Sequence, residues 1–253
     1  MGESFAGLRP VEDPDAVGGG IAPRTGGLGS SVTDVVPRGF PAYARILHPV
    51  DLGGDEEPGT WAGVAARTGR VVHALAQWRS IVTPVAGQDL PVGPEGRWAD
   101  VQVREGHLEP EALRAVLSVL APFTGDQECV LGMWEGWGWL HGSTGVRYTS
   151  GGKGSPPPPL ARPPIPDVVN AATSYPHLHL PGRDYLLFQG PLDAALRTGK
   201  QITPDWFDPQ SPSLVWPLDR SWFLASEIDF DSTLLAGSAE LVAALLAAPG
   251  IEA

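Results

Sequence analysis

The sequence predicts an α+β fold in which a mainly antiparallel sheet is flanked by a few helices. Strand-like runs concentrate between residues 128 and 230, whereas the clearest helical patterns, residues 109–120 and 239–248, lie outside that stretch. The 253-residue chain also contains 32 glycines and 27 prolines, which predicts short elements joined by many loops.

The chain is expected to divide into an irregular start and one larger domain. Residues 1–31 are rich in glycine and weakly apolar, which predicts an irregular Gly/Pro-rich N-terminal arm. Residues 32–253 are expected to form a single α+β domain with a substantial core. A Pro-rich insertion is expected at about residues 142–167. Its prolines at 156–159 favour a stiff polyproline II loop or a ligand for a proline-reading domain.

Strands are expected where apolar side chains alternate with polar ones, or run together between turn residues. The Pro-Leu-Asp-Arg sequence at residues 217–220 indicates a hairpin-like reversal between two of these strands. The five predicted strands are residues 40–49, 128–134, 183–190, 213–217 and 221–230.

Helices are expected where apolar residues recur at helical spacing. Residues 109–120 show this pattern best, with Pro110 in the first turn and Pro122 as the expected stop. Ser238 is a typical N-cap for a second helix, residues 239–248. Shorter helices are predicted at residues 61–70, 72–78 and 191–197.

The charge of the chain disfavours several classes of partner. The net charge is −12, and residues 201–253 carry eight acidic residues and one basic residue, Arg220. Such a protein repels nucleic-acid phosphates and anionic membranes, so neither is an expected partner. A basic partner or a metal cation would be attracted. The simpler interpretation is that the charge only maintains solubility.

The cysteine content and the N-terminal residues favour a cytoplasmic location. Cys129 is the only cysteine, which excludes an internal disulfide and a cysteine-based metal cluster. Residues 1–5 lack the features of a secretory signal, and no run of eighteen apolar residues predicts a membrane span. No cofactor-binding motif is recognised, so no cofactor is expected.

The segment Trp134-Glu135-Gly136-Trp137-Gly138-Trp139 is the most informative part of the sequence. Its tryptophans are either core residues or the wall of a pocket, where aromatic faces beside a carboxylate suit a sugar, a cationic amine or a partner's side chain. If the segment is extended, Glu135, Trp137 and Trp139 share one face. The candidate ligand-binding residues are Trp134, Glu135, Trp137, Trp139, His141 and Arg183.

Glu227, Asp229 and Asp231 form the second candidate site. On a strand, residues two apart point to the same face, so the three carboxylates would project together. They could then bind a divalent cation or work as an acid/base pair with Glu135. Alternatively they form a solvated face, paired with Arg183 or Arg220.

The histidines and nucleophiles carry weaker signals. His177 and His179 would lie on one side of a strand as a metal-ligand pair, but the sequence places no third ligand beside them. Together with Asp229 and Asp231 they are the weak metal candidates, and no metal site is predicted. Cys129 lies in an apolar run where a thiol is usually inert, and a Gly-x-Ser-x-Gly elbow is absent.

Four motifs resemble a family of uncharacterised actinobacterial proteins. They are Phe-Pro-Ala-Tyr-Ala-Arg-Ile-Leu-His-Pro at residues 40–49, the Trp/Gly segment at 134–139, Leu-Pro-Gly-Arg-Asp-Tyr at 180–185 and Trp-Pro-Leu-Asp-Arg-Ser-Trp at 216–222. The likeness extends to residues 227–234 and spans most of the chain from about residue 36. The resemblance implies an actinobacterial origin and a single domain, and it transfers no catalytic residue.

Two functions follow as hypotheses. The preferred one is a non-catalytic cytoplasmic recognition protein that binds a partner protein or a small ligand through a Trp-rich and acidic surface. The alternative is a carboxylate- or divalent-metal-dependent hydrolase that uses Glu227, Asp229 and Asp231. The ligand and the oligomeric state stay open.

Overall fold

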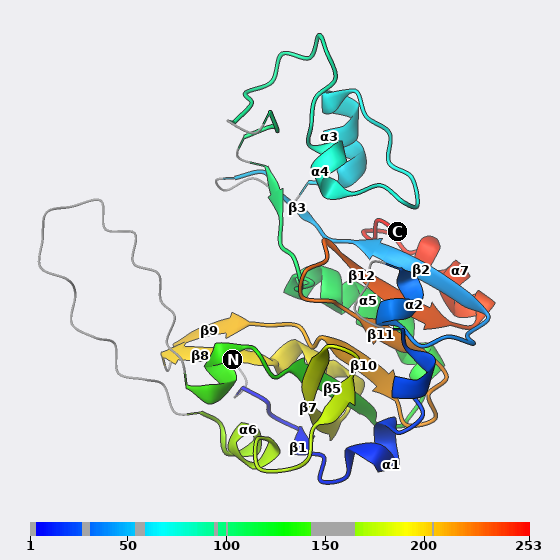
Figure 1. Cartoon of the computed structure of the whole chain (residues 1–253), viewed down its shortest axis with the longest axis vertical. Helices are drawn as coiled ribbons and strands as arrows, with labels where there is room; N and C mark the ends of the chain where they lie inside the picture. Colours follow the sequence, from blue (N-terminus) through cyan, green and yellow to red (C-terminus); the bar gives the residue numbers. More distant parts are fainter. Residues whose placement is uncertain are drawn as a thin grey trace, which may run out of the picture.

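The computed structural model describes residues 4–26, 31–53, 59–93, 96–99, 101–142, 165–203 and 205–253. Its centre is an eight-stranded antiparallel sheet, so the α+β prediction is confirmed (Figure 1). The strand order is β1-β7-β5-β10-β11-β12-β2, and β6 also pairs with β7. The bounds are β1 Arg9–Pro10, β2 Ala42–Leu47, β5 Cys129–Trp134, β6 Leu178–Leu180, β7 Arg183–Gly190, β10 Leu214–Pro217, β11 Phe223–Ala225 and β12 Ser232–Gly237.

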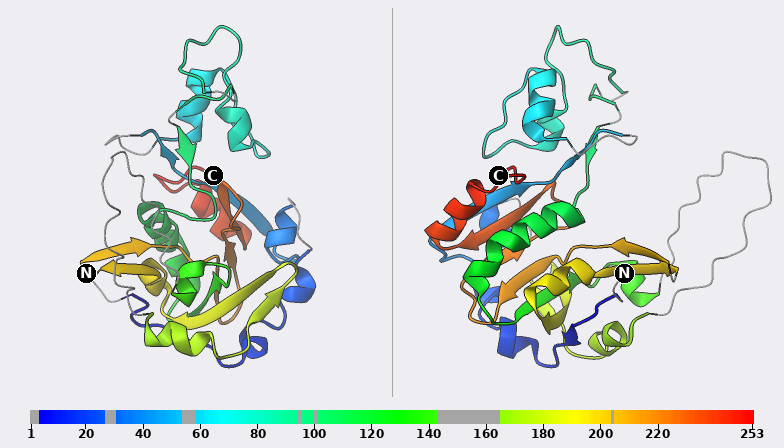
Figure 2. Two further views of the ribbon diagram at one scale, coloured as in Figure 1. Left: turned by 60° about the vertical axis from the view of Figure 1, so that its left-hand side comes forward. Right: turned by 180° about the vertical axis from the view of Figure 1, so that it is seen from behind.

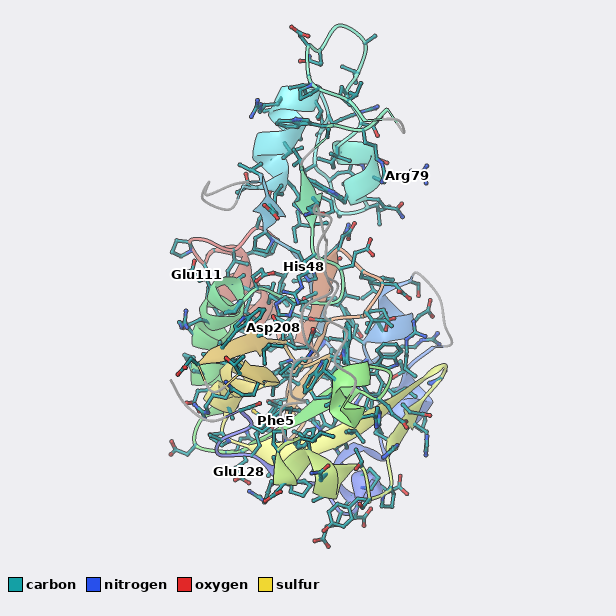
Figure 3. The ribbon with its side chains drawn as sticks, turned by 90° about the vertical axis from the view of Figure 1, so that its left-hand side faces the viewer. Phe5, His48, Arg79, Glu111, Glu128 and Asp208 are labelled. Atoms are coloured by element: carbon teal, nitrogen blue, oxygen red, sulfur yellow. The ribbon has the colours of Figure 1, made fainter. Side chains whose placement is uncertain are left out.

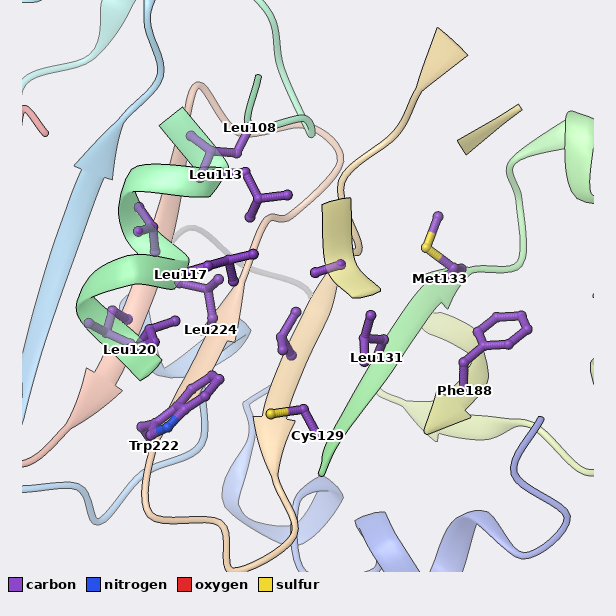
Figure 4. Close-up of a cluster of buried hydrophobic side chains, with 14 of the residues drawn as sticks. Leu108, Leu113, Leu117, Leu120, Cys129, Leu131, Met133, Phe188, Trp222 and Leu224 are labelled. Carbon is purple, nitrogen blue, oxygen red and sulfur yellow. The ribbon is translucent and has the colours of Figure 1, made fainter. Parts of the chain in front are cut away.

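Helices cover one face of this sheet and the N-terminal segment covers the other. On the helical face, α5 (Pro110–Thr124) and α7 (Ala239–Leu246) pack side by side, with α6 (Asp167–Ala172) and the 3₁₀ helix η3 (Leu192–Arg197) beside them (Figure 2). Alternate strand residues reach each face: Val215 and Leu131 point toward α5, whereas Leu214 and Trp216 point away from it. Figure 4 shows the leucines of α5 beside Leu224 and Trp222, with Leu131 of the same cluster farther along the sheet.

Residues 4–26 form more regular structure than the irregular arm that the sequence predicts. They contain β1, α1 (Pro14–Gly18) and the 3₁₀ helix η1 (Ala22–Arg24), and α2 (Val32–Val35) follows. Phe5 is 2% exposed and lies between Trp139 and Phe188, with ring centroids 6.1 and 4.9 Å away. Apolar residues such as Phe5 therefore order this segment by packing on the sheet. Residues 27–30 of the arm and 143–164 of the predicted insertion lie outside the described residues.

Three predicted elements differ in extent from the observed ones. The predicted helix 72–78 is wrong: those residues form a loop, and only α4 (Trp78–Ile81) is helical. Pro122 does not stop α5, which continues for two more residues to Thr124, although the proline has no N–H to donate to the carbonyl of Ser118. The strand predicted to run to residue 230 ends at Ala225, since the chain turns and Gly106 donates its N–H to the carbonyl of Phe230.

A small lobe, residues 50–103, stands apart from the main body that the rest of the chain forms (Figure 1). It contains β3 (Val50–Asp51), α3 (Trp61–Thr68), α4 and β4 (Gln102–Val103). The lobe has its own core around Trp61, Val64 and Ile81. The pairing of β3 with β4 forms the stalk by which the chain enters and leaves the lobe. A separate hairpin, β8 (Gly199–Thr203) and β9 (Trp206–Pro209), projects from the main body.

Carboxylates of the main body hold the helices of the small lobe. Asp231 accepts the N–H of Trp78, the first residue of α4, at 3.0 Å, and pairs with Arg45 at 2.7 Å. The Arg45 guanidinium also donates to the carbonyl of Ala76. Glu252 accepts the first two N–H groups of α3 at 2.6 and 2.7 Å. These contacts place the lobe over the edge of the sheet.

His48 joins the stalk of the lobe to the sheet inside the protein. Its Nδ1 lies 2.7 Å from the carbonyl of Arg104, and its Nε2 lies 2.9 Å from the hydroxyl of Thr233. A carbonyl only accepts, so Nδ1 carries the proton and the Thr233 hydroxyl donates to Nε2. Thr233 then accepts from the Ser226 hydroxyl at 2.7 Å. His48 is therefore a neutral link in a buried chain of hydrogen bonds.

The longest helix among the described residues is α5, with 15 residues. Within this part of the chain, no helix has both the length and the apolar character needed to cross a bilayer.

Candidate functional site

The Trp134–Trp139 segment turns instead of continuing as a strand. β5 ends at Trp134, Trp137 donates its N–H back to the carbonyl of Trp134, and Gly138–His141 form the 3₁₀ helix η2. The prediction that Glu135, Trp137 and Trp139 share one extended face is therefore wrong. Glycine at alternate positions of the segment lets the chain turn where continuous β-formers would have extended it.

The tryptophans of this segment mainly pack against other side chains. Trp137 and Trp139 lie against the core on the α5 side of the sheet. The Trp134 ring meets the edge of Trp137 at 5.4 Å and the guanidinium of Arg183 at 5.7 Å, and it lies directly against Gly136. The Trp134 ring is consequently in contact with Trp137, Arg183 and Gly136 of the same chain.

Gly136 is expected to be required for packing, which substitution with alanine tests. A Cβ at this position would overlap the Trp134 ring, so Gly136→Ala should lower the free energy of unfolding by about 2 kcal/mol. Gly20→Ala is the matched control, because a Cβ there meets its nearest atom at an ordinary 3.7 Å. Urea denaturation measures both variants, and equal stabilities would contradict the packing role.

A cleft of about 520 Å³ brings four of the six predicted ligand-binding residues together. Trp134, Glu135, His141 and Arg183 line it, with Asp184 beside them. Trp137 and Trp139 are not among its lining residues. We call this the Trp134 cleft.

The ionisable side chains of the Trp134 cleft already have partners within the chain. Glu135 pairs with His177 at 3.1 Å, and Asp184 pairs with His179 at 2.7 Å. Arg183 contacts Glu227 and Asp229, both at 2.9 Å. Because each of these groups already has a partner, a ligand in this cleft would have to compete with contacts inside the protein.

The three carboxylates predicted to share a strand face are separated. Glu227 and Asp229 meet at Arg183, whereas Asp231 pairs with Arg45 beneath the small lobe. The strand prediction failed because the chain turns after Ala225. The histidines His177 and His179 likewise have different carboxylate partners. Among the described residues, no three His, Cys, Asp or Glu side chains gather in the manner of a metal site.

Cys129 is inert in this structure. It is fully buried in β5, and burial raises the pKa of its thiol to about 12. A thiol with such a pKa is almost wholly protonated at neutral pH and is a poor nucleophile.

A much larger cleft, about 1400 Å³, lies between the small lobe, α5 and the segment that follows α7. We call it the lobe cleft. The apolar part of its lining comes from β2, β3, α5 and Ile251; the residues include Ile46, Leu47, Val50, Ala112, Val116 and Ile251. A cleft of this size with an apolar lining and a few polar groups is typical of binding sites.

Four carboxylates and one guanidinium line the lobe cleft: Asp51, Glu109, Glu111, Glu252 and Arg104. Glu111 lies in the first turn of α5, and no hydrogen-bond or ion-pair partner contacts its side chain among the described residues. Among the described residues, Asp51 accepts from neutral groups alone, the N–H of Gly53 and the amide of Gln102. The lobe cleft therefore carries an excess of negative charge.

Glu109 is held in its anionic form. The buried His107 accepts the N–H of Ser211 at Nδ1, so the proton is on Nε2, which lies 3.6 Å from the Glu109 carboxylate. The interaction with His107 lowers the pKa of Glu109, burial opposes it, and Arg104 at 3.4 Å lowers it further. A carboxylate with a lowered pKa is a permanent anion at neutral pH and a weak general base.

The sequence placed Glu109 and Glu111 at the start of its clearest helix but gave no sign of the lobe cleft. The cleft exists because residues 50–103 fold into a lobe and because Glu252 returns to the N-terminus of α3. These contacts join residues about 190 positions apart. Acidic residues in the first turn of a helix are common for dipole reasons alone.

No protein-family model matches the chain, and neither a curated protein nor a solved structure matches it.

Proposed function

We propose that the protein is a non-catalytic recognition protein that binds a positively charged, partly apolar ligand or protein segment in the lobe cleft. The observation that carries this proposal is the uncompensated negative charge above an apolar floor. Four acidic residues line the space and Arg104 is the single base among its described lining residues. Glu252 also accepts two N–H groups of α3 and Glu109 lies near Arg104, so Asp51 and Glu111 are the acids that no cation or helix end engages among the described residues. A cation that also carries apolar groups would satisfy both parts of this surface.

The pairing of charges favours the lobe cleft over the Trp134 cleft. In the Trp134 cleft, His177 and His179 already contact the carboxylates of Glu135 and Asp184 at 3.1 and 2.7 Å, and Arg183 is held by Glu227 and Asp229. In the lobe cleft, the Glu111 carboxylate has no partner among the described residues. The Glu109 carboxylate has longer contacts, 3.4 Å to Arg104 and 3.6 Å to His107. A bound cation would therefore form stronger electrostatic interactions in the lobe cleft than in the Trp134 cleft.

The state of the candidate catalytic groups supports recognition over the alternative, a hydrolase that uses Glu227, Asp229 and Asp231. Arg183 and Arg45 engage these carboxylates, which lie in two different places. The Cys129 thiol is buried, and the low pKa of Glu109 suits binding better than proton transfer.

Binding of a labelled peptide tests the proposed function. A fluorescein-labelled peptide that alternates arginine and leucine should bind the protein, and the same peptide with glutamate in place of arginine should not. Fluorescence anisotropy at low and high salt measures both. Glu111→Gln should weaken binding about fivefold, the equivalent of about 1 kcal/mol for one partly exposed charge pair.

Asp126→Asn is the matched control for Glu111→Gln. Asp126 is an exposed acid just beyond the opposite end of α5, and its removal changes the net charge by the same amount. If both variants weaken binding equally, the peptide responds only to the overall charge of the protein. Equal binding of the arginine and glutamate peptides would also contradict the proposal.

A further inference from the structure

The loop between α3 and α4 carries the most exposed apolar side chains of the described residues. Val71 is 76% exposed and Leu75 is 83% exposed. The loop begins at Gly69, whose φ of +73° ends α3, and runs down the right-hand side of the small lobe (Figure 1). A hollow of about 410 Å³ lies beside Val71 and Leu75, so the loop is not packed closely on the lobe. We call residues 69–79 the lobe tip. Two neighbouring apolar side chains in such a position are typical of an interaction surface.

The lobe tip is basic in an otherwise acidic protein. Residues 69–79 contain two arginines and no acidic residue, whereas the whole chain has a net charge of −12. Arg70 and Arg79 are both exposed, and Arg70 lines the same hollow as Val71 and Leu75. Figure 3 shows the Arg79 side chain extending from the lobe. The partner of the lobe tip is therefore expected to be acidic with an apolar floor.

The lobe cleft of the same chain has this composition. Its floor is apolar and its rim carries Asp51, Glu109 and Glu111. We infer that the lobe tip of one copy docks in the lobe cleft of a second copy. This inference rests on the proposed function, because it names an occupant for the cleft: a basic segment with apolar anchors that the chain itself supplies.

The two surfaces cannot satisfy each other within one copy. In Figure 3, Arg79 and Glu111 lie on opposite sides of the junction between lobe and main body. The contact therefore joins different copies: the tip of one copy lies in the cleft of another. Because the contact is between copies, the fraction of assembled protein grows with protein concentration. One loop in one cleft is a small interface, which makes the association weak and sensitive to salt.

Complementation between two broken variants tests this arrangement. Leu75→Asp replaces an apolar side chain of the lobe tip with an acid and leaves the lobe cleft unchanged. Glu111→Lys reverses a charge in the lobe cleft and leaves the lobe tip unchanged. In sedimentation velocity, the wild-type protein should show a mass that rises with concentration, and about tenfold weaker association in high salt. Each variant alone should be a monomer. Their equimolar mixture should form a complex of two chains and no larger species. The intact tip of one variant occupies the intact cleft of the other, and no functional surface remains for a third chain.

Circular dichroism melting of each variant confirms that it is folded. If Leu75→Asp melts early, Arg79→Glu serves as a second tip variant with the same expectation. A wild-type protein that stays monomeric at every concentration would overturn the inference, as would a mixture that fails to associate. Binding of the tip to anionic vesicles or to an acidic peptide, without self-association, would also overturn it.

The arginine–leucine peptide separates this inference from the proposed function. Leu75→Asp retains the cleft, so it should bind the peptide with the wild-type affinity. Peptide binding together with a monomeric wild type would refute self-docking and leave the proposed function in place. Self-association that Glu111→Lys does not weaken, in a protein that ignores the peptide, would refute both.

Discussion

Acidification to about pH 4 is expected to lower the free energy of unfolding by about 3 kcal/mol through His48 alone. Burial lowers the pKa of His48 from its ordinary 6.5 to about 4, although the carbonyl of Arg104 and the charge of Asp231 oppose the shift. The unfolded chain therefore takes up a proton on this histidine before the folded protein does. The resulting stability is complete above pH 6.5 and is lost as the pH falls toward 4.

The hydrogen bonds of His48 show which part of the protein its protonation would disturb. Protonation places a second donor at Nε2, where the Thr233 hydroxyl now donates, so the chain from Ser226 through Thr233 must rearrange. His48 also sits beside both strands of the stalk. We expect the small lobe to loosen before the sheet unfolds, which hydrogen exchange of the α3 amides at pH 5 and 7 would detect.

Urea denaturation between pH 4 and 8 measures the His48 effect as a difference between variants. His48→Gln should be less stable than the wild type at pH 7, and the gap should shrink as the pH falls. His179→Gln is the control, because the His179 side chain is 72% exposed and its removal should leave the pH dependence nearly unchanged. A constant gap between His48→Gln and the wild type across this range would refute the prediction.

Arg45→Met is expected to destabilise the protein by about 3 kcal/mol. The substitution removes the guanidinium from Asp231, whose side chain is 17% exposed, and leaves that carboxylate without its cationic partner. It also removes the contacts to Ala76, to the Ser232 hydroxyl and to the ring of Trp61. Because these contacts hold the lobe that walls the lobe cleft, peptide affinity should fall as well.

Arg9→Met is the matched control for Arg45→Met. Arg9 pairs with Glu128 at 2.5 Å, but the two side chains are 55% and 37% exposed. Loss of such an exposed pair should cost at most about 1 kcal/mol and leave peptide binding intact. The double variant Arg45→Met/Asp231→Asn should be more stable than the sum of the single effects implies. Additive effects would show that the Arg45–Asp231 pair contributes nothing specific.

The predictions that succeeded rest on local patterns. The strands β5, β7 and β10 and the helices α5 and α7 are recognisable because each carries its own periodicity and end signals. The Ser238 hydroxyl accepts the N–H of Leu241, as its N-cap pattern predicts. The predictions that failed depend on distant contacts. The stretch 221–230 is rich in strand-forming residues, yet its second half turns to meet Gly106, more than a hundred positions earlier.

The same distinction explains the candidate site. Four of the predicted ligand-binding residues, Trp134, Glu135, His141 and Arg183, line one cleft, because β5 and β7 are neighbours in the sheet. The sequence offered Arg183 as a partner for the acidic residues after position 226, and it contacts Glu227 and Asp229. Residue types alone did not reveal that His177, 42 positions from Glu135, contacts that carboxylate. The lobe cleft could not be predicted from the sequence. Its walls come from β2, the lobe, α5 and the segment after α7, and no short motif indicates that these segments lie together.

The carboxylates that hold α3 and α4 set an order of folding. These helices have 8 and 4 residues, well below the length at which an isolated helix persists in water. Their first N–H groups meet Glu252 and Asp231, which follow in the chain by as many as 191 and 153 positions. Closing such long loops is slow, so the lobe forms late, after the sheet has brought these acids into place. During synthesis on the ribosome, we therefore expect residues 50–103 to emerge early and to fold only after the last residues of the main body have been made.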